Sequence, residues 1–355
     1  MKILMFITGL GMGGAEKVVC ELADKLYEFG HEVNIVYFTG EILRKPLNQN
    51  INIYKIPLNL NISIFSTLNQ LIRLVDKLNP DVLHAHMFHA NILARYVKMF
   101  RKEVRVICSS HSNYEGGRIR MAMYSITENL CDVHTNVSYN AAKALMKAGA
   151  VRYKEIIAVY NGIDINKYKF DENLRNNTRK KLAFSENSNL IIAIGRIDTP
   201  KDYPTLLKAY KIVREMNNNT FLLIVGDGPK KQEIQDLSKS LGIHEYVVFL
   251  GIRNDVPDLL NACDLFVSSS AWEGFGIAIL EAMISTIPIV ATNTDGAREL
   301  LNQDLIEVGN YKNLAAAINV KLRNKINNSD FSKLIYRFDW NKIIENWLDI
   351  YGANR

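Results

Sequence analysis

Short apolar runs rich in Val, Ile and Leu recur along the chain, and they alternate with longer stretches that have apolar residues at helical spacing. The runs predict buried strands and the longer stretches predict amphipathic helices. The predicted strands are 2–8, 32–38, 51–56, 82–84, 104–109, 133–137, 156–160, 190–194, 220–225, 246–250, 265–268 and 287–290. The clearest helices are 15–29, 64–78, 203–216, 230–241 and 277–284. This alternation is typical of parallel sheets covered by helices.

Two regions break the alternation and divide the chain. Residues 161–189 are polar and rich in Asn, with no sustained period, which indicates a linker. Residues 338–351 form an amphipathic helix whose apolar face carries Trp340, Ile344, Trp347 and Tyr351. We therefore predict an α/β protein with two Rossmann-like, doubly wound parallel-sheet domains. The predicted parts are a first domain over 1–165, a linker over 166–189, a second domain over 190–335 and a terminal helix over 336–355.

Composition excludes several classes of protein. The chain has 355 residues, 48% hydrophobic and 23% charged, which suits two globular domains and excludes disordered and fibrous proteins. No apolar run approaches the length of a membrane span, and the N-terminal run leads into a glycine loop without a signal-peptide cleavage site. The net charge of +6 favours anionic ligands or an anionic membrane surface and is too small to indicate nucleic acid. The 4 cysteines form no CxxC pair, which argues against zinc and favours a reducing cytoplasm.

A glycine loop follows the first predicted strand. Gly9, Gly11 and Gly14 match the dinucleotide-binding pattern GxGxxG. The acidic residue that should contact a ribose is poorly placed, because the nearest candidate, Glu41, lies in a loop beyond the second strand. Three interpretations stay open: an NAD(P) site, a loop for another ligand that approaches the backbone amides, and a tight structural turn.

Three loops of the second half follow predicted strands, where ligands of open α/β sheets bind. Arg196 and Lys201 follow strand 190–194 and could clamp a diphosphate, although a solvated basic loop is the alternative. Gly226 follows strand 220–225 and suits either the close approach of a ligand or a structural turn.

The third loop leads from strand 265–268 into helix 277–284. Glu273 precedes a glycine-flanked turn, and Glu281 lies inside this almost wholly apolar helix. A lone carboxylate there requires partners, which ribose hydroxyls or an internal Arg or amide would supply. The backbone amides at the start of the helix suit sugar hydroxyls or phosphate.

In this segment, EGFGIAILE, the chain resembles glycosyltransferase family 4, the retaining glycosyltransferases of the GT-B fold, whose Glu-x7-Glu signature is matched by Glu273 and Glu281. The resemblance covers essentially the whole chain. Further matching segments, in order, are 13–16, 161–164, 195–202, 225–229, 249–251 and 255–283. It implies two facing domains with an interdomain cleft, of which the first binds the acceptor and the second binds the nucleotide-sugar. It also implies that the terminal helix, 336–355, crosses back to pack on the first domain. It also implies transfer of a hexose or N-acetylhexosamine, with retention of configuration, from a nucleotide-sugar that we expect to be UDP-linked.

The resemblance also implies roles for single residues. Arg196 and Lys201 would bind the donor diphosphate and stabilise the leaving group, Glu273 would contact the donor sugar, and Glu281 would contact the ribose. His111 resembles the family histidine that reaches the donor sugar, although alone it could be an ordinary loop histidine. The remaining donor-site residues are expected to be Gly13, Gly14, Gly195, Gly226, Arg253, Phe275, Gly276 and Ile277.

We expect no cofactor and no metal. Metal-dependent transferases often use an Asp-x-Asp loop, and no such pair follows a predicted strand, so Arg196, Lys201 and a helix dipole would replace the cation. The one cluster that invites a metal is His84-x-His86-x-x-His89. It begins in a strand and continues toward a helix, so the three rings need not converge, and packing or cleft lining is the interpretation we favour.

The acceptor is the least defined partner. Residues 95–105 and 118–124 mix basic and apolar side chains, which favours an anionic membrane interface, with a solvated helix face as the alternative. Similar bacterial family members that build O-antigen or capsule use polyprenyl-diphosphate-linked acceptors. We therefore expect a peripheral enzyme at the cytoplasmic face of the membrane, with a saccharide acceptor and no nucleic-acid partner. The alternative function is an NAD(P)-dependent oxidoreductase that uses the N-terminal glycine loop.

Overall fold

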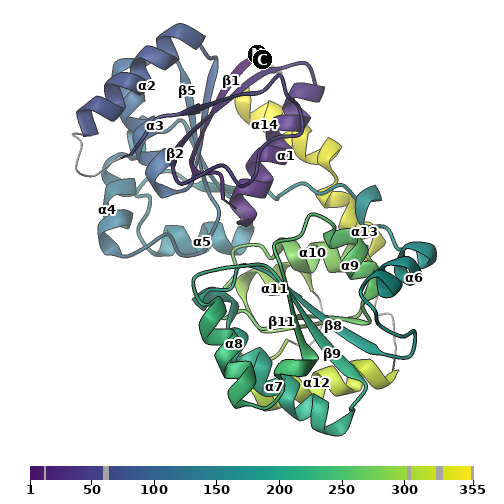
Figure 1. Cartoon of the computed structure of the whole chain (residues 1–355). Helices are drawn as coiled ribbons and strands as arrows, with labels where there is room; N and C mark the ends of the chain where they lie inside the picture. Colours follow the sequence, from purple (N-terminus) through teal and green to yellow (C-terminus); the bar gives the residue numbers. More distant parts are fainter. Residues whose placement is uncertain (12, 59–63, 302–304, 325–330, 353–355) are drawn as a thin grey trace. The chain divides into compact units, whose positions relative to one another are not determined.

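The chain folds into two compact units. The computed structural model describes residues 1–11, 13–58, 64–301, 305–324 and 331–352 (Figure 1). The first unit consists of Met1–Gly162 together with Trp340–Arg355, and the second consists of Ile163–Asp339. The C-terminal segment therefore belongs to the same unit as the N-terminus.

The first unit is a parallel sheet with the strand order β3-β2-β1-β4-β5-β6-β7. Its strands are β1 (Lys2–Gly9), β2 (Glu32–Thr39), β3 (Asn52–Lys55), β4 (Val82–His86), β5 (Arg105–Ser110), β6 (Val133–Asn136) and β7 (Ile156–Ala158). Its helices are α1 (Gly14–Glu28), α2 (Ile64–Leu78), α3 (Phe88–Phe100), α4 (Arg118–Ile126), η1 (Glu128–Leu130), α5 (Tyr139–Lys147) and α14 (Trp340–Tyr351). The strand order reverses between β1 and β4, which is where doubly wound sheets bind their ligands.

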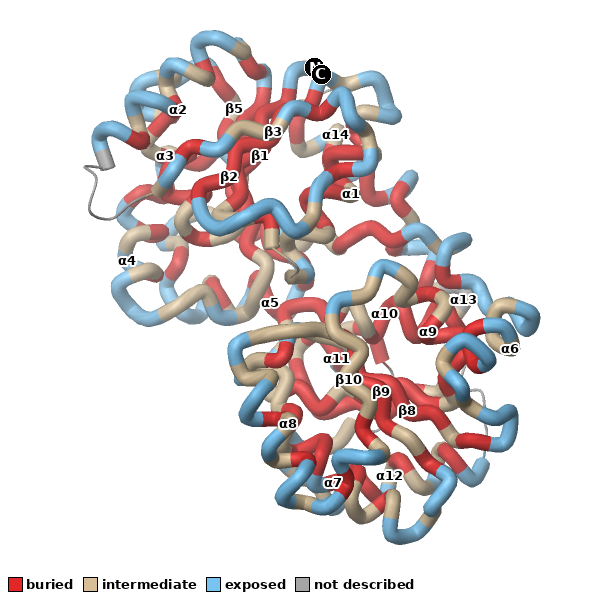
Figure 2. Tube along the Cα trace, in the orientation of Figure 1, coloured by how far each residue is buried: buried red, intermediate tan, exposed pale blue. Residues whose placement is uncertain are grey.

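Successive residues of β1 point to opposite faces of this sheet, and both faces are covered. Ile3 and Met5 pack with Trp347 of α14 in one core, whereas Leu4 and Phe6 belong to a second core. Figure 2 shows the buried central strands between exposed outer helix surfaces. A strand that is buried on both faces needs a continuous apolar run, which is why β1 carries no polar alternation.

The second unit is a parallel sheet with the order β10-β9-β8-β11-β12. Its strands are β8 (Asn189–Ile194), β9 (Thr220–Val225), β10 (Val247–Gly251), β11 (Leu265–Ser268) and β12 (Ile289–Ala291). Its helices are η2 (Asn166–Tyr168), α6 (Glu172–Lys181), η3 (Thr199–Lys201), α7 (Tyr203–Met216), α8 (Lys231–Ser240), η4 (His244–Tyr246), α9 (Val256–Ala262), α10 (Ile277–Ile284), α11 (Asp295–Leu300), α12 (Tyr311–Asn324), α13 (Ser332–Ile335) and η5 (Tyr336–Phe338). One of its cores joins β8 and β9 to α7 and α12, through residues such as Ile191, Leu222, Tyr210 and Ile318.

The predicted fold class is confirmed. Each predicted strand has a counterpart within a few residues, and the sheets are parallel, with helices between successive strands except β2 and β3. All four cysteines are buried, and burial raises the pKa of the Cys20 thiol to about 12. In the described part of the chain, no helix has both the length and the apolar character needed to cross a bilayer.

The structure differs from the prediction over residues 166–189. This stretch was expected to be an irregular linker, but it contains η2 and α6 and packs within the second unit. The reason is Arg179, which is only 1% exposed and donates to the Asp264 carboxylate at 2.6 Å and to the Ala262 carbonyl at 2.8 Å. The polar composition of residues 166–189 wrongly indicated a linker, because the buried charge of Arg179 is paired with Asp264, far along the chain.

Candidate active site

The loops that follow β8, β9 and β11 meet at one edge of the second sheet, because these strands are neighbours and parallel. Backbone hydrogen bonds join the loops. The amide of Gly195 donates to the carbonyl of Val225 at 2.9 Å, and the amide of Ala271 donates to the carbonyl of Pro200 at 2.8 Å. The three sequence segments singled out above therefore form one continuous edge.

Lys201 and Glu273 are in direct contact at this edge. The ammonium of Lys201, at the end of η3, forms an ion pair with Oε1 of Glu273, and the hydroxyl of Ser270 donates to the same oxygen at 2.8 Å. The Lys201 and Glu273 side chains are 23% and 16% exposed. The hydroxyl of Ser269 donates to the Lys201 carbonyl at 2.8 Å. This arrangement holds a cation and a carboxylate in fixed positions where both can still be reached by a ligand.

Glu281 lies deeper, in α10, and is only 4% exposed. One of its carboxylate oxygens accepts a hydrogen bond from the hydroxyl of Tyr168 at 2.8 Å. Tyr168 belongs to η2 and is itself buried. The sequence had left ribose hydroxyls or an internal Arg or amide as partners, and it missed the tyrosine. Contact of Glu281 with a ribose stays a prediction.

The two predicted arginines lie on exposed parts of the loops. The Arg196 side chain is 64% exposed and pairs with Asp198 at 3.6 Å. Arg253 forms a two-pronged pair with Asp255, with its Nε 2.7 Å from Oδ1. Within the described residues, neither arginine is bonded to Lys201 or Glu273. Each is free to turn toward an incoming anion at the small energetic cost of a surface ion pair.

Backbone geometry explains two of the predicted glycines. Gly226 has a φ of 138°, and a Cβ there would lie 2.1 Å from the carbonyl oxygen of Gly195, so no larger residue fits. Gly276 has a φ of 85° and is the N-cap of α10. Phe275 before it is buried against Phe338, with ring centroids 5.4 Å apart, and Ile277 opens the helix. The start of α10 thus places backbone amides beside Glu273 at the loop edge.

The glycine loop of the first unit ends in α1, for which Gly13 is the N-cap and Gly14 the first residue. As a glycine, Gly13 has no side chain with which to cap this helix. The helix N-terminus therefore lies at the carboxyl end of β1, beside the switch point of the first sheet. Position 12 of the loop lies outside the described residues, so the match to the dinucleotide pattern gains no further support.

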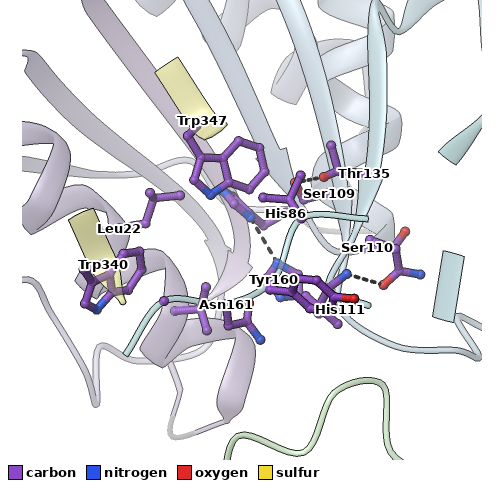
Figure 3. A pocket seen from close by; sticks show the side chains of 15 residues that line it. Leu22, His86, Ser109, Ser110, His111, Thr135, Tyr160, Asn161, Trp340 and Trp347 are labelled. Atoms are coloured by element: carbon purple, nitrogen blue, oxygen red, sulfur yellow. Dashed lines mark hydrogen bonds between the residues drawn. The ribbon is translucent and has the colours of Figure 1, made fainter. Parts of the chain in front are cut away.

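His111 follows β5 and lines a small cavity of about 10 Å³, room for about one water (Figure 3). Its Nε2 lies 3.0 Å from Nδ1 of His86, which ends β4. The His86 ring packs against that of His84 with 3.9 Å between centroids, and the His84 ring packs against that of Trp347 at 4.5 Å, both pairs being tilted. His84 is held by Tyr351 and Ser109, each at 2.7 Å. His111 is therefore the outer end of an ordered row of aromatic rings.

These histidines are neutral at physiological pH. Burial lowers the pKa of His111 to about 4, and it lowers the pKa of His84, His86 and His134 well below the ordinary value. Nearby, Glu115 was missed by the sequence analysis. It accepts from the His111 amide at 3.2 Å and from the Tyr124 hydroxyl at 2.5 Å, and burial raises its pKa. Its only sequence signal was its place in a loop after a strand.

Among the described residues, no three or more His, Cys, Asp or Glu side chains are arranged to hold a metal ion. His89 lies on α3, away from the stacked pair of His84 and His86. His84 and His86 are both buried in the core of the first unit, and His86 also lines its cavity.

The basic segment 95–105 differs from its prediction. Arg95 is only 1% exposed and donates to the Tyr124 carbonyl at 2.7 Å, so it cannot face a membrane. Lys98 pairs with Asp132 at 2.8 Å. In the second segment, Arg120 packs over the ring of Phe88 at 4.6 Å. Helical periodicity turns part of a basic run inward, which the composition of the run does not reveal.

Comparison with known proteins accounts for nearly the whole chain. Residues 175–337 match the family described as Glycosyl transferases group 1, and residues 12–167 match Glycosyltransferase Family 4. The alternative of an NAD(P)-dependent oxidoreductase has no support in these matches.

Two curated relatives and one solved structure are similar over most of their length. N-acetyl-alpha-D-glucosaminyl L-malate synthase of Bacillus anthracis is 28% identical, covering 89% of this chain and 86% of the relative. An Escherichia coli UDP-Gal:alpha-D-GlcNAc-diphosphoundecaprenol alpha-1,3-galactosyltransferase is 24% identical, covering 96% of this chain and 94% of the relative. The crystal structure of Anabaena HepE with UDP and glucose has a TM-score of 0.88 at 23% identity, covering 99% of this chain and 100% of that chain. This likeness establishes the GT-B fold.

Proposed function

The chain belongs to the group 1, family 4 glycosyltransferases, which act on nucleotide sugars, and from this membership we propose that it transfers a hexose or N-acetylhexosamine from a UDP-linked donor. The proposed acceptor is a saccharide carried on a polyprenyl diphosphate, and the anomeric configuration of the donor is retained. The proposed setting is surface-polysaccharide synthesis at the cytoplasmic face of the membrane.

The donor proposal rests on the edge of the second sheet where the loops after β8, β9 and β11 meet. There the Lys201 ammonium and the Glu273 carboxylate are bonded to each other, beside the start of α10. A nucleoside diphosphate sugar presents negative phosphates next to neutral hydroxyls, so it matches a cation and a helix N-terminus next to a carboxylate acceptor. UDP is supported by the donor in the Escherichia coli relative's name and by the UDP bound to HepE.

The chemistry follows from where charge develops. As the bond between sugar and diphosphate breaks, negative charge grows on the departing phosphate oxygens. Lys201 neutralises that charge from a loop that is already fixed by backbone bonds, and Arg196 turns toward it from its exposed pair with Asp198. Glu273 orients the sugar through its hydroxyls, and Glu281 binds the ribose. These residues replace a metal ion in the proposal, so no cofactor is required.

Membrane contact is proposed through α4 of the first unit. Ile119 and Ile126 are 79% and 73% exposed and lie two helical turns apart with exposed Ala122 between them, which gives α4 an outward apolar stripe beside Arg118. An apolar stripe flanked by a cation suits the interface of an anionic bilayer. A lipid-linked acceptor is supported by the diphosphoundecaprenol in the name of the Escherichia coli relative.

The donor is tested by thermal shift with UDP, GDP, ADP, dTDP and NAD(P), followed by hydrolysis and transfer assays with the matching sugar nucleotides. We expect UDP to stabilise the protein and a UDP-sugar to be consumed. Stabilisation by another nucleotide alone would replace UDP in the proposal. Anomeric proton couplings of the isolated product show whether the configuration is retained.

The membrane contact is tested by flotation with vesicles that contain anionic phospholipid. Ile119→Glu combined with Ile126→Glu should abolish flotation. The stripe would then be negatively charged and would be repelled by the anionic lipid. Val320→Glu is the matched control, since Val320 is 56% exposed on α12 of the second unit. Equal recovery of the wild-type protein with and without vesicles would refute the contact. Arg120 is unsuitable for charge reversal because it packs on Phe88.

A further inference from the structure

The bond between His86 and His111 joins two neutral imidazoles, and this fixes where their protons can be. Nδ1 of His86 and Nε2 of His111 are 3.0 Å apart. Burial lowers the pKa of both rings, so each carries one N–H near pH 7. One nitrogen of the pair must therefore be protonated and the other bare.

The second nitrogen of His86 indicates which of the two donates. Nε2 of His86 is buried and has no hydrogen-bond partner in the described part of the chain. If His111 donated, His86 would keep its proton on this nitrogen, as a buried N–H with no acceptor among the described residues, and unpaired buried donors are rarer than unpaired acceptors. If His86 donates from Nδ1, only a lone pair is left unpaired. The second arrangement leaves His111 protonated on Nδ1.

The ring of His86 is held so that this donor points at His111. It packs against the ring of His84 with 3.9 Å between centroids. Both nitrogens of His84 are hydrogen-bonded, one to the hydroxyl of Tyr351 and the other to that of Ser109. Ser109 is in turn bonded to Thr135 at 2.6 Å. Rotation of the His86 ring would replace its bonded nitrogen with carbon at the His111 contact. Strands β4, β5 and β6 and helix α14 thus all contribute to the position of one N–H (Figure 3).

We propose that His86 is a positioning residue that donates from Nδ1 to Nε2 of His111, fixes the His111 proton on Nδ1, and makes His111 a hydrogen-bond donor to an oxygen of the substrate. Nδ1 of His111 has no partner among the described residues. With its only lone pair used by His86, His111 cannot remove a proton from an acceptor hydroxyl. It binds a hydroxyl or phosphoryl oxygen instead. The role of His111 as a donor to the substrate rests on the proposed function, whereas the position of its proton does not.

The proton position can be measured in the ligand-free protein. Long-range proton–nitrogen correlation spectra distinguish protonated from bare ring nitrogens, and the chain has only 7 histidines. The His111 signals are assigned by their loss in His111→Gln. We expect His111 to be protonated on Nδ1 in the wild-type protein. Protonation on Nε2 would overturn the proposal, whatever the enzyme turns out to transfer.

Three variants test the role of His86 itself. His86→Phe keeps the stacked ring but removes the donor, so the His111 proton should move to Nε2, whereas His86→Asn returns an N–H near the lost position and should keep it on Nδ1. His89→Phe is the matched control, because His89 is on α3 and is not bonded to His111. An unchanged His111 spectrum in His86→Phe would also overturn the proposal.

The same variants separate this inference from the proposed function. Once a donor is identified, His86→Phe should lower kcat/KM by about 2- to 10-fold, the effect of one lost neutral hydrogen bond, and His86→Asn should restore most of it. His86→Phe added to His111→Phe should cause no further loss, because the two act as a unit. If His111→Phe left the transfer rate unchanged, His111 would have no role in catalysis. The measured position of its proton would still stand.

Discussion

The first unit should lose stability steeply as the pH falls below about 6.5, because four of its histidines are buried in the neutral form. These are His84, His86, His111 and His134, and burial lowers the pKa of each. In the unfolded chain each titrates near its ordinary pKa of about 6.5. Between that value and the lower folded pKa, the unfolded state binds more protons than the folded state. The free energy of unfolding is therefore highest above pH 6.5 and falls with acidification.

The magnitude follows from the number of protons. For His111, a pKa lowered from 6.5 to about 4 corresponds to about 3.4 kcal/mol of unfolding free energy, at about 1.4 kcal/mol per pKa unit. Around pH 5.5 each of the four histidines takes up nearly one proton on unfolding, so together they contribute about 5 kcal/mol per pH unit. Domains are stable by only about 5–15 kcal/mol, so the first unit should unfold before the pH reaches about 4.

The tryptophans allow the first unit to be followed alone. Of the 3 tryptophans, Trp340 and Trp347 belong to the first unit and Trp272 to the second. In a Trp272→Phe background, urea denaturation read by fluorescence reports the first unit, at a series of pH values from about 7 to 5.5. His86→Phe should reduce the pH slope by about one proton. A wild-type slope below about 1.4 kcal/mol per pH unit, one proton, would refute the reasoning.

Four further predictions concern the second unit and its transfer reaction. Lys201→Met should lower kcat in a transfer assay by about 10²- to 10³-fold, the effect of losing one preorganised charge. Lys231→Met is the control: it removes only an exposed ion pair with Asp227 and should change kcat little. Glu281→Gln should weaken UDP binding by about 10-fold in calorimetry, and unchanged affinity would exclude the ribose contact. Gly226→Ala should cost more than about 2 kcal/mol of unfolding free energy, whereas Gly242→Ala, also at positive φ but in open space, should cost less by urea denaturation. EDTA should leave transfer unchanged, and loss restored by Mg²⁺ would show a metal requirement.

Much of the fold could be predicted from the sequence because it depends on local pattern. Helix α7 was predicted with its observed bounds, 203–216, and β9 and β11 likewise. The helix buries one apolar stripe and the strands are buried on both faces. The spacing of their apolar residues therefore predicts the type of each element. Segment α6 could not be predicted in the same way. The charge of its buried Arg179 is neutralised by Asp264, and no local sequence pattern can predict a partner 85 residues away.

The side-chain contacts within the candidate site could not be predicted from the sequence. The need of Glu281 for a partner follows from its apolar helix, but Tyr168 lies 113 residues before it in the chain. A motif places a residue at the end of a strand. The side chain that it meets depends on which strand is the neighbour, and strand order is a property of the whole sheet.

The pair of His86 and His111 shows what strand order adds. Strands β4 and β5 are adjacent, and their register places His86 beside Ser109. His111 is two residues beyond Ser109, which returns it to the same face of the sheet. Had the β4–β5 pairing been known, the contact could have been derived without coordinates. The same register predicts that a one-residue deletion between His84 and His86 would turn His86 away and leave His111 without its donor. The function of such a site is therefore encoded jointly by a motif and by the sheet that places it.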